Sequence, residues 1–372
     1  MELKVREVST KKEIKEFVKF QIELYKGNPF YVPPLLDFEL STLLKEKNPA
    51  FDHADAKYWV AEKKGKIVGK IAAIVLDEEL KNKSLARFGW IDFVDDKQVS
   101  NLLFETAADW VTSKGATAIH GPIGFTDLDF EGALIEGFDE LATQATIYNH
   151  PYYIDHYRTW GLEASATWSE NRLKMPDEVP ERLEKGARIV SERYGIQVKK
   201  FKKAREIKKY ANGVFDVLND AYSHLYGYHK LTQKQIDYYV DQYFGMVRKD
   251  FVKILVDRED KVIGFAISLP SLSRAFQKAK GSLFPFGFIH VLRAFQSNKH
   301  VDLFLIGVLP DYQKLGASAV IIHELTREYI KRKVELVTSG PMLEDNSNVL
   351  MSWKDYELLP GSIRRSCFIK KL

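Results

Sequence analysis

The order of the expected elements repeats once along this chain, and the repeat constrains the fold more than any other feature of the sequence. In each half a short strand is followed by helices, a β-hairpin, a further strand and a helix. The hairpins contain similar tetrapeptides, Lys66-Ile67-Val68-Gly69 in the first half and Lys261-Val262-Ile263-Gly264 in the second. Self-similarity of this kind indicates two copies of one structural unit. The sequence therefore predicts a tandem repeat of mixed α/β domains.

Length and composition agree with two domains. A chain of 372 residues exceeds what one hydrophobic core usually organises, and a hydrophobic fraction of 45% is typical of a globular protein. Pro176 and Pro180 prevent a helix or strand from continuing through the segment between the halves. We therefore expect an N-terminal domain at residues 1–178 and a C-terminal domain at residues 179–372.

Hydrophobic periodicity assigns the individual elements. In the first half it predicts a strand at 3–8, a helix at 11–25, a hairpin at 58–62 and 67–76, a strand at 87–94, a helix from 99 up to a stop at Gly115 and a strand at 117–121. In the second half it predicts a strand at 197–201, helices at 204–225 and 232–246, and a hairpin at 251–257 and 262–269.

Charge and cysteine content argue against several classes of protein. The net charge of +4 is spread over interleaved acidic and basic residues, so nucleic acid is not an expected partner. The amino terminus lacks the apolar core of a signal peptide, which predicts a cytoplasmic protein. The most apolar stretch, residues 282–295, is interrupted by polar residues and too short to span a bilayer, so we expect no membrane span. The single cysteine, Cys367, cannot form an intrachain disulfide and has no metal-ligand companions at suitable spacing. We expect it to fill a core, and we expect no metal site.

The aromatic segment Leu283–Phe288 has three interpretations: an apolar wall of a substrate site, a lip that touches a membrane, or packing between the domains. Aromatic clusters in globular proteins are usually buried. This favours packing between the domains.

The segment with the clearest chemical meaning is a strand, a turn and a helix near the carboxyl end. The apolar run 303–309 predicts a strand buried on both faces, and Pro310 ends it. The polar turn 311–318 precedes a helix with apolar residues on one face. The free amides and the dipole at such a helix start attract an anion, and Gly316 lets a phosphate approach the backbone. The turn predicts a site for a pyrophosphate-like group.

This segment resembles motif A of the GNAT acetyltransferase superfamily, usually written Q/R-x-x-G-x-G/A, with Ser318 as a mild departure from the last position. The resemblance implies two domains, each a mostly antiparallel central sheet flanked by helices, and a coenzyme A site in the second. A simple left-handed turn that joins a strand to a helix is the alternative. The residues that the resemblance assigns to the cofactor are Ile306, Gly307, Val308, Gln313, Lys314, Leu315, Gly316, Ala317 and Ser318.

Downstream residues resemble the family's cofactor arm and acid. Asn346 corresponds to an asparagine that contacts the cofactor, and Tyr356 to a tyrosine that protonates the departing thiolate. Trp353 is the other residue that aligns with that tyrosine, and it could not act as the acid. Glu344, with the neighbouring Asp345, could accept the amine proton through water; the alternative is a helix-capping or solvated carboxylate.

The first half resembles the same fold but replaces the glycine loop with Asp95 and Asp96. Carboxylates at a helix start repel a pyrophosphate, so we expect this domain not to bind coenzyme A in the usual way. Asn149 and the Tyr157–Leu162 segment resemble the family's Asn and Tyr-x-x-x-Gly-Phe pattern. The glycine-rich stretch 121–132 forms either an acceptor pocket or a surface loop.

The resemblance predicts an enzyme that transfers an acyl group from acetyl-coenzyme A, or another acyl-coenzyme A, directly to an amine of a small molecule or peptide. Two alternatives stay open. A Fem-type transferase would take an aminoacyl group from transfer RNA, and a non-catalytic sensor or scaffold would bind the acyl-coenzyme A without turnover. The acceptor, the acyl length and the oligomeric state remain open.

Overall fold

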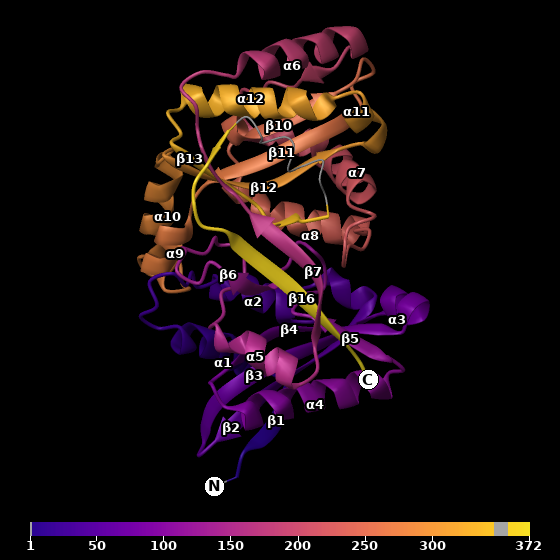
Figure 1. The fold of residues 1–372 in the computed structure, drawn as a ribbon, viewed down its shortest axis with the longest axis vertical. Helices are drawn as coiled ribbons and strands as arrows, with labels where there is room; N and C mark the ends of the chain where they lie inside the picture. Colours follow the sequence, from indigo (N-terminus) through magenta and orange to yellow (C-terminus); the bar gives the residue numbers. More distant parts are fainter. Residues whose placement is uncertain (1, 346–355) are drawn as a thin grey trace. The chain divides into compact units, whose positions relative to one another are not determined.

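The computed structural model describes residues 2–345 and 356–372, which form two compact units (Figure 1). Unit 1 comprises Met1–Trp168, Ser273–Val291 and Ile363–Leu372, and unit 2 comprises Ser169–Leu272 and Leu292–Ser362. The units therefore do not follow a single cut between residues 178 and 179. The reason is that two later segments pack into unit 1, one of which is the C-terminal strand.

Unit 1 is built on a mixed sheet in which neighbouring strands β1 to β4 are antiparallel and β4 and β5 are parallel. The C-terminal strand β16 pairs antiparallel with β5 and also with the short strand β6. The order of this sheet is β1-β2-β3-β4-β5-β16-β7-β14, and β14 (Met342–Leu343) is a short strand. The strands are β1 (Lys4–Val8), β2 (Ala54–Lys63), β3 (Lys66–Leu76), β4 (Leu85–Phe93), β5 (Ala118–Gly121), β6 (Ala133–Glu136), β7 (Glu163–Glu170) and β16 (Ile363–Lys371).

The helices of unit 1 begin at clear sequence signals. The Thr10 side chain caps α1 and forms a reciprocal capping box with Glu13, and Asp96 caps α4. The apolar face of α4 is buried with β3 and β4 in one core. The helices are α1 (Lys11–Leu24), α2 (Leu36–Leu43), α3 (Asp77–Lys83), α4 (Lys97–Ser113), α5 (Tyr152–Thr159) and α9 (Ser273–Ala279), with a 3-10 turn at Pro49–Asp52.

Unit 2 contains a second mixed sheet, with the order β15-β8-β13-β12-β11-β10-β9. Its neighbours are antiparallel except for the parallel pair β12 and β13. The strands are β8 (Arg172–Lys174), β9 (Gln197–Val198), β10 (Val252–Val256), β11 (Val262–Pro270), β12 (His300–Val308), β13 (Leu336–Ser339) and β15 (Glu357–Leu358).

Helix α12 covers the sheet of unit 2, and α6 lies beside α12 (Figure 1). The buried side of α12 carries Ile321, Ile322, Leu325 and Tyr329, as the helical spacing predicts. The helices are α6 (Glu181–Tyr194), α7 (Ala211–Ala221), α8 (Gln233–Tyr243), α11 (Pro310–Lys314) and α12 (Ala317–Lys331), with 3-10 turns at Ala204–Tyr210, Phe244–Met246 and Lys249–Phe251. Helix α10 (Gly287–Gln296) begins in unit 1 and ends in unit 2.

The repeat predicted from the sequence is visible in the topology. Each unit contains a hairpin, a strand, a helix and a further strand parallel to the previous one, which are β2-β3-β4-α4-β5 in unit 1 and β10-β11-β12-α12-β13 in unit 2. Both predicted hairpins are confirmed. The mixed α+β class and the tandem arrangement are therefore confirmed.

Candidate functional site

The last residues of strand β12 have no paired strand on one side among the described residues. Its parallel pairing with β13 stops at Leu303, opposite Ser339. The strand continues to Val308, and no described strand pairs with residues 304–308 on that side. The sequence predicted a strand buried on both faces, but Phe304, Leu305 and Ile306 are only half-buried. That prediction is wrong at this end of the strand, where the missing neighbour leaves the residues less covered.

The peptide groups of Ile306 and Val308 point towards this open side. On the other side, the Leu309 N–H donates to the carbonyl oxygen of Ile263 at 2.9 Å, and β11 runs antiparallel to β12. Successive residues of a strand point their peptide groups in opposite directions. Residues 306 and 308 therefore face away from β11, along one edge of the strand.

Two hydrogen bonds support this direction. The carbonyl oxygen of Ile306 accepts from the Tyr222 hydroxyl at 3.1 Å. The carbonyl oxygen of Val308 accepts from Nε2 of Gln313 at 2.7 Å. Both carbonyl oxygens thus have partners within the protein, and a ligand strand at this edge would meet the N–H groups first.

Gly307 has a different role from its two neighbours. It lies opposite Phe265 on β11, and a Cβ added at Gly307 would lie 2.8 Å from the Phe265 ring. Real Cβ atoms do not approach other atoms this closely. Packing against Phe265 therefore accounts for this glycine.

The turn after β12 brings the rest of the predicted loop together. Pro310 begins the short helix α11, and Leu315 ends it. Gly316 then adopts a left-handed conformation with φ of +87°, and α12 starts at Ala317. Only glycine adopts this conformation without strain from a Cβ. The predicted sequence of strand, turn and helix is confirmed.

The start of α12 has the features of an anion site. The N–H groups of Ala317 and Ser318 have no acceptor inside the helix, and the helix dipole adds about half a positive charge at this end. A Cβ at Gly316 would contact Val190 at 3.3 Å, so the glycine lies against α6 on one side. The Lys314 ammonium is exposed, with Asp311 at 3.3 Å. Donor groups and chain clearance therefore fit a phosphate at this turn.

Tyr356, the predicted acid, lies in the core of unit 2. The residue is 8% exposed, and its hydroxyl lies 2.5 Å from Oγ1 of Thr326. Because Thr326 donates its own proton to the carbonyl oxygen of Ile322 at 2.7 Å, the Tyr356 hydroxyl donates to Thr326. The hydroxyl proton of Tyr356, which a general acid would have to donate to the thiolate, therefore lies in a hydrogen bond to Thr326 of α12.

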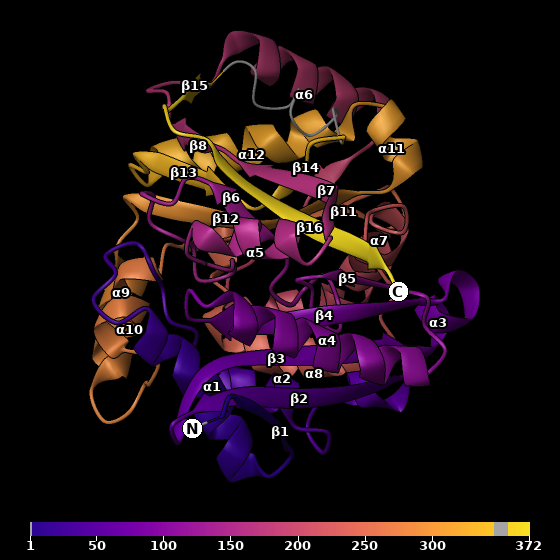
Figure 2. The same cartoon turned by 60° about the horizontal axis from the view of Figure 1, so that its bottom comes forward.

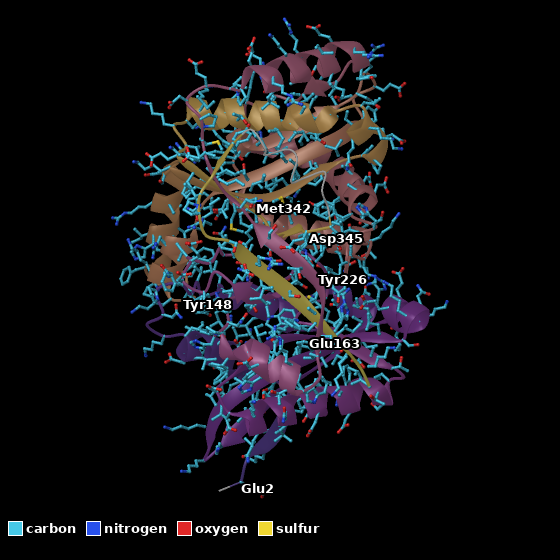
Figure 3. All side chains as sticks on the ribbon, in the orientation of Figure 1. Glu2, Tyr148, Glu163, Tyr226, Met342 and Asp345 are labelled. Atoms are coloured by element: carbon cyan, nitrogen blue, oxygen red, sulfur yellow. The ribbon has the colours of Figure 1, made fainter. Side chains whose placement is uncertain are left out.

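The other predicted residues downstream lie at the edge of the described chain. Glu344 and Asp345 form a turn directly after β14, with Glu344 half-buried and Asp345 exposed. Figure 3 labels Met342 and Asp345, which mark the two ends of this short segment. Asn346 and Trp353 lie outside the described residues.

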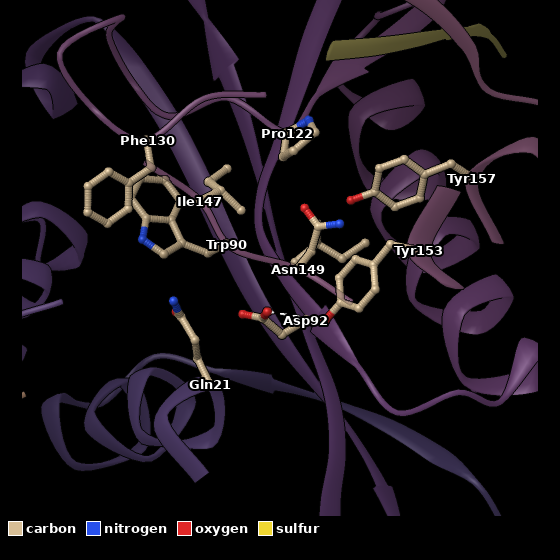
Figure 4. Close-up of a pocket in the computed structure, with 10 residues that line it drawn as sticks. Gln21, Trp90, Asp92, Pro122, Phe130, Ile147, Asn149, Tyr153 and Tyr157 are labelled. Atoms are coloured by element: carbon tan, nitrogen blue, oxygen red, sulfur yellow. Dashed lines mark hydrogen bonds between the residues drawn. The ribbon is translucent and has the colours of Figure 1, made fainter. Parts of the chain in front are cut away.

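Unit 1 contains a pocket that the sequence did not predict as a site (Figure 4). Its lining combines apolar side chains with a carboxylate, two amides and two tyrosines. In Figure 4 the Tyr157 hydroxyl points towards Asn149, near the middle of the pocket. The lining residues are Gln21, Trp90, Ile91, Asp92, Pro122, Phe130, Ile147, Asn149, Tyr153 and Tyr157. Two residues of the stretch 121–132, Pro122 and Phe130, line this pocket.

The polar centre of this pocket is a buried ion pair. The Asp92 carboxylate lies 3.1 Å from the Lys70 ammonium, and both side chains are almost completely buried. The hydroxyls of Tyr25 and Tyr153 donate to Asp92 at 2.9 and 3.2 Å. Burial raises the pKa of Asp92, while Lys70 and the hydroxyl donors oppose this shift. The cluster compensates a charge that would otherwise be costly inside the unit.

Trp90 adds a strained feature to the same pocket. It has a positive φ of 44°, where the register between β3 and β4 shifts. Its indole N–H donates to Oε2 of Glu39 at 2.6 Å. Burial raises the pKa of Glu39 to about 7, with the indole hydrogen bond acting in the opposite direction. A non-glycine residue with a positive φ beside a pocket is the kind of strain that surrounding contacts must maintain.

The turn between β4 and α4 differs from its counterpart in unit 2. The Asp96 carboxylate accepts from the N–H of Gln98 at 3.0 Å and pairs with Lys63 at 2.9 Å. Asp95 lies 2.9 Å from Nε2 of the buried His156. The predicted aspartate cap is confirmed, and it occupies the position that a phosphate would need.

A signal for the pocket was present in the sequence. Lys70 and Asp92 interrupt otherwise apolar strands, and charged residues are seldom fully buried unless paired. This pattern predicts an internal ion pair, but the spacing in sequence does not reveal that α1 and α5 close over it.

The described part of the chain contains no group of three or more metal-binding side chains, and none of its helices is long and apolar enough to cross a membrane.

Comparisons with known proteins agree with this fold. No family model matches the chain. It is 29% identical over 358 residues to Protein YghO of Escherichia coli strain K12, covering 93% of this chain and 90% of that protein. It is 24% identical over 298 residues to a bacterial ceramide synthase of Caulobacter vibrioides, covering 78% of this chain and 76% of that protein.

Among solved structures, a tandem GNAT protein from the clavulanic acid biosynthesis pathway is similar over 100% of this chain and 98% of its own length. The TM-score is 0.55 and the sequence identity is 13%. Similarity at this level concerns the fold and does not extend to substrates. With the two mixed sheets and the repeated parallel strand pair, it shows that the chain is a tandem-domain protein of the GNAT fold.

Proposed function

We propose that this protein is an acyl-coenzyme A-dependent N-acyltransferase whose donor site lies in unit 2. The observation that carries the proposal is the turn after β12, where Gly316 at φ +87° leads directly into α12. This turn follows the open edge of β12, so an anion site and an unpaired strand edge are adjacent in the chain. Motif A of the GNAT superfamily uses this combination.

Each part of the site has a proposed task. The N–H groups of Ala317 and Ser318 would hold the pyrophosphate, and the helix dipole would add to the attraction. The N–H groups of Ile306 and Val308 would pair with the extended arm of the cofactor and orient its reactive end. Bound in this way, an acyl-coenzyme A would supply an acyl group activated as a thioester.

The proton transfers are proposed for two residues. Glu344 would accept the proton of the amine through water, since it is half-buried beside β14. Tyr356 would protonate the leaving thiolate. To do so, its hydroxyl must first break the hydrogen bond to Thr326. Asn346 completes the proposed donor site.

The acceptor proposed for the first experiments is a long-chain amine. One relative is named a bacterial ceramide synthase, and a ceramide is an amide of a long-chain amino alcohol. The identity of 24% makes this a choice of first substrate rather than an assignment.

The experiment is a transfer assay with acetyl-, octanoyl- and palmitoyl-coenzyme A, each offered sphinganine, a polyamine and a peptide amine. Released thiol is measured with a thiol reagent, and the product is identified by mass spectrometry. The single cysteine, Cys367, is fully buried, so the folded protein contributes little background. We expect thiol release together with an amide product for one acceptor class. Binding without release would favour a sensor, and aminoacyl transfer from transfer RNA without any use of coenzyme A thioesters would favour the Fem-type alternative.

A further inference from the structure

The charged residues of the segment that includes α9 and the start of α10 are all basic. Between Lys261 and Val301 the sequence contains no aspartate or glutamate. Three basic residues of this segment lie on or directly after α9, namely Arg274, Lys278 and Lys280, and all three are exposed. We call them the basic flank.

Three phenylalanines follow the basic flank, and they are unusually exposed. Phe284 is 74% exposed, Phe286 is 70% exposed and Phe288 is 39% exposed. The rings of Phe284 and Phe288 lie 6.1 Å apart between centroids, so they form a pair. We call these three residues the aromatic tip. The sequence favoured their burial by packing between the domains, and that expectation is wrong for Phe284 and Phe286.

Local hydrogen bonds fix the shape of the aromatic tip. The Ser282 hydroxyl donates to the carbonyl oxygen of Phe284 at 2.9 Å, and the Phe288 N–H donates to that of Leu283 at 2.7 Å. A Cβ at Gly287 would lie only 2.0 Å from the carbonyl oxygen of Ser282. The turn is therefore tight, and the rings are held outward by its backbone.

The base of the segment is fastened to the rest of unit 1. Nε2 of Gln277 donates to the carbonyl oxygens of Pro29 and Tyr31 at 2.8 and 2.9 Å. The Leu36 N–H donates to the carbonyl oxygen of Gly281 at 2.9 Å. Figure 2 shows α9 and α10 next to one another. The anchored base and the exposed tip give the segment the form of a fixed projection.

We propose that the aromatic tip and the basic flank dock this protein onto a lipid bilayer that carries anionic headgroups. Exposed aromatic side chains enter the boundary between headgroups and acyl chains, and neighbouring basic side chains are attracted to the negative surface. Neither contribution alone anchors a protein stably, but the segment combines both. This inference goes beyond the transfer reaction and does not depend on it.

Charge complementarity favours a bilayer over a second copy of the chain. In a symmetric contact between two copies, the basic flanks would approach one another without any acid of this segment to neutralise them. An anionic membrane supplies negative charge at the depth where the flank would lie. Each basic residue near such a surface strengthens binding roughly fivefold.

The test is sedimentation of the full-length protein with vesicles of phosphatidylcholine alone and with 30% phosphatidylglycerol. We expect the wild type to bind the anionic vesicles at least tenfold more strongly than the neutral ones. The double variant Phe284→Ser/Phe286→Ser and the double variant Lys278→Glu/Lys280→Glu should each lose at least tenfold of this binding. Matched controls are Ile189→Ser, at an apolar residue of α6 that is 57% exposed, and Lys11→Glu/Lys12→Glu at the start of α1.

A second measurement reports the depth of the tip. Cys367 is buried, so a Leu292→Cys variant, at a residue of α10 that is 58% exposed, accepts a fluorophore at one exposed position near the tip. We expect its emission to shift to shorter wavelength with anionic vesicles, while a label at Ile189→Cys stays unchanged. Equal binding by the wild type and the Phe284→Ser/Phe286→Ser variant, or no vesicle binding by the wild type, would overturn the proposal. A wild-type dimer that the same variant dissociates would also overturn it, because the tip would then be an interface between copies.

Discussion

Nε2 of Gln313 donates to the carbonyl oxygen of Val308 at 2.7 Å, so the turn after β12 is tied back to the last residue of the strand that precedes it. The bond closes a loop of six residues that contains Pro310 and most of α11. Because the same loop leads to Gly316, the side chain of Gln313 sets the position of the proposed pyrophosphate site. Its role is positioning, and the proposed contacts to the cofactor come from backbone N–H groups.

Replacing Gln313 tests this role. Gln313→Ala removes the tie, and we expect a loss of about 1 kcal/mol in the free energy of unfolding, as for a single hydrogen bond. The coenzyme A affinity of Gln313→Ala should fall several-fold. That of Gln313→Glu should fall further, because a carboxylate cannot donate a hydrogen bond and repels phosphate. Asp311→Ala is the control, since Asp311 is exposed and pairs only weakly with Lys314. Calorimetric titration of all four proteins checks the order, and an affinity of Gln313→Glu equal to that of the wild type would contradict it.

Tyr356→Phe separates an acid from a packing residue. If the hydroxyl protonates the leaving thiolate, transfer should slow by about a hundredfold while KM changes little. If it serves only the bond to Thr326, we expect a loss of about 1 kcal/mol of stability and an unchanged rate. Thr326→Val removes the partner and keeps the tyrosine, so it reports the structural effect alone. A turnover rate of Tyr356→Phe that matches Thr326→Val would remove Tyr356 from the mechanism.

Glu39 should make the stability of unit 1 depend on pH. Its pKa in the folded protein is about 7, against an ordinary value of 4.5, because the carboxyl is buried. Between pH 4.5 and about 7, Glu39 keeps its proton in the folded protein but has lost it in the unfolded protein. The free energy of unfolding therefore falls as the pH rises. The slope is about 1.4 kcal/mol per pH unit, up to a total of about 3 kcal/mol.

The matched variant for this prediction is Glu39→Gln, which keeps an oxygen acceptor for the indole N–H of Trp90. We expect it to match the wild type near pH 4 and to exceed its unfolding free energy at pH 8. Urea unfolding followed by tryptophan fluorescence measures both. Parallel curves for the two proteins across this range would show that Glu39 does not carry the effect.

Local patterns in the sequence predicted much of the fold. The hairpins, the cap at Asp96 and the turn at Gly316 depend on residues close together in the chain, and all of them appear in the structure. The position of β16 was not predicted. Its pairing with β5 joins residues about 250 positions apart, and periodicity contains no information on such partners.

The candidate sites also differ in whether their residues lie close together in the sequence. The loop from Gln313 to Ser318 is continuous in sequence, so a motif could predict it. The pocket in unit 1 was missed because it combines Gln21 of α1, Asp92 of β4 and Tyr153 of α5, which only the folded sheet brings together. The exposure of Phe284 was missed for the opposite reason, since an aromatic residue is buried more often than not and only the tight turn at Gly287 holds it outward.

The central claim is that the turn at Gly316 binds coenzyme A, and calorimetric titration tests it most directly. The proteins are the wild type, Gly316→Asp and Gly27→Asp; Gly27 has a similar φ of +85° with open space around it, so it controls for backbone strain. The account predicts saturable binding of coenzyme A by the wild type and by Gly27→Asp, and a loss of at least tenfold, about 1.4 kcal/mol, for Gly316→Asp. No binding by the wild type, or equal affinities for all three proteins, would contradict it.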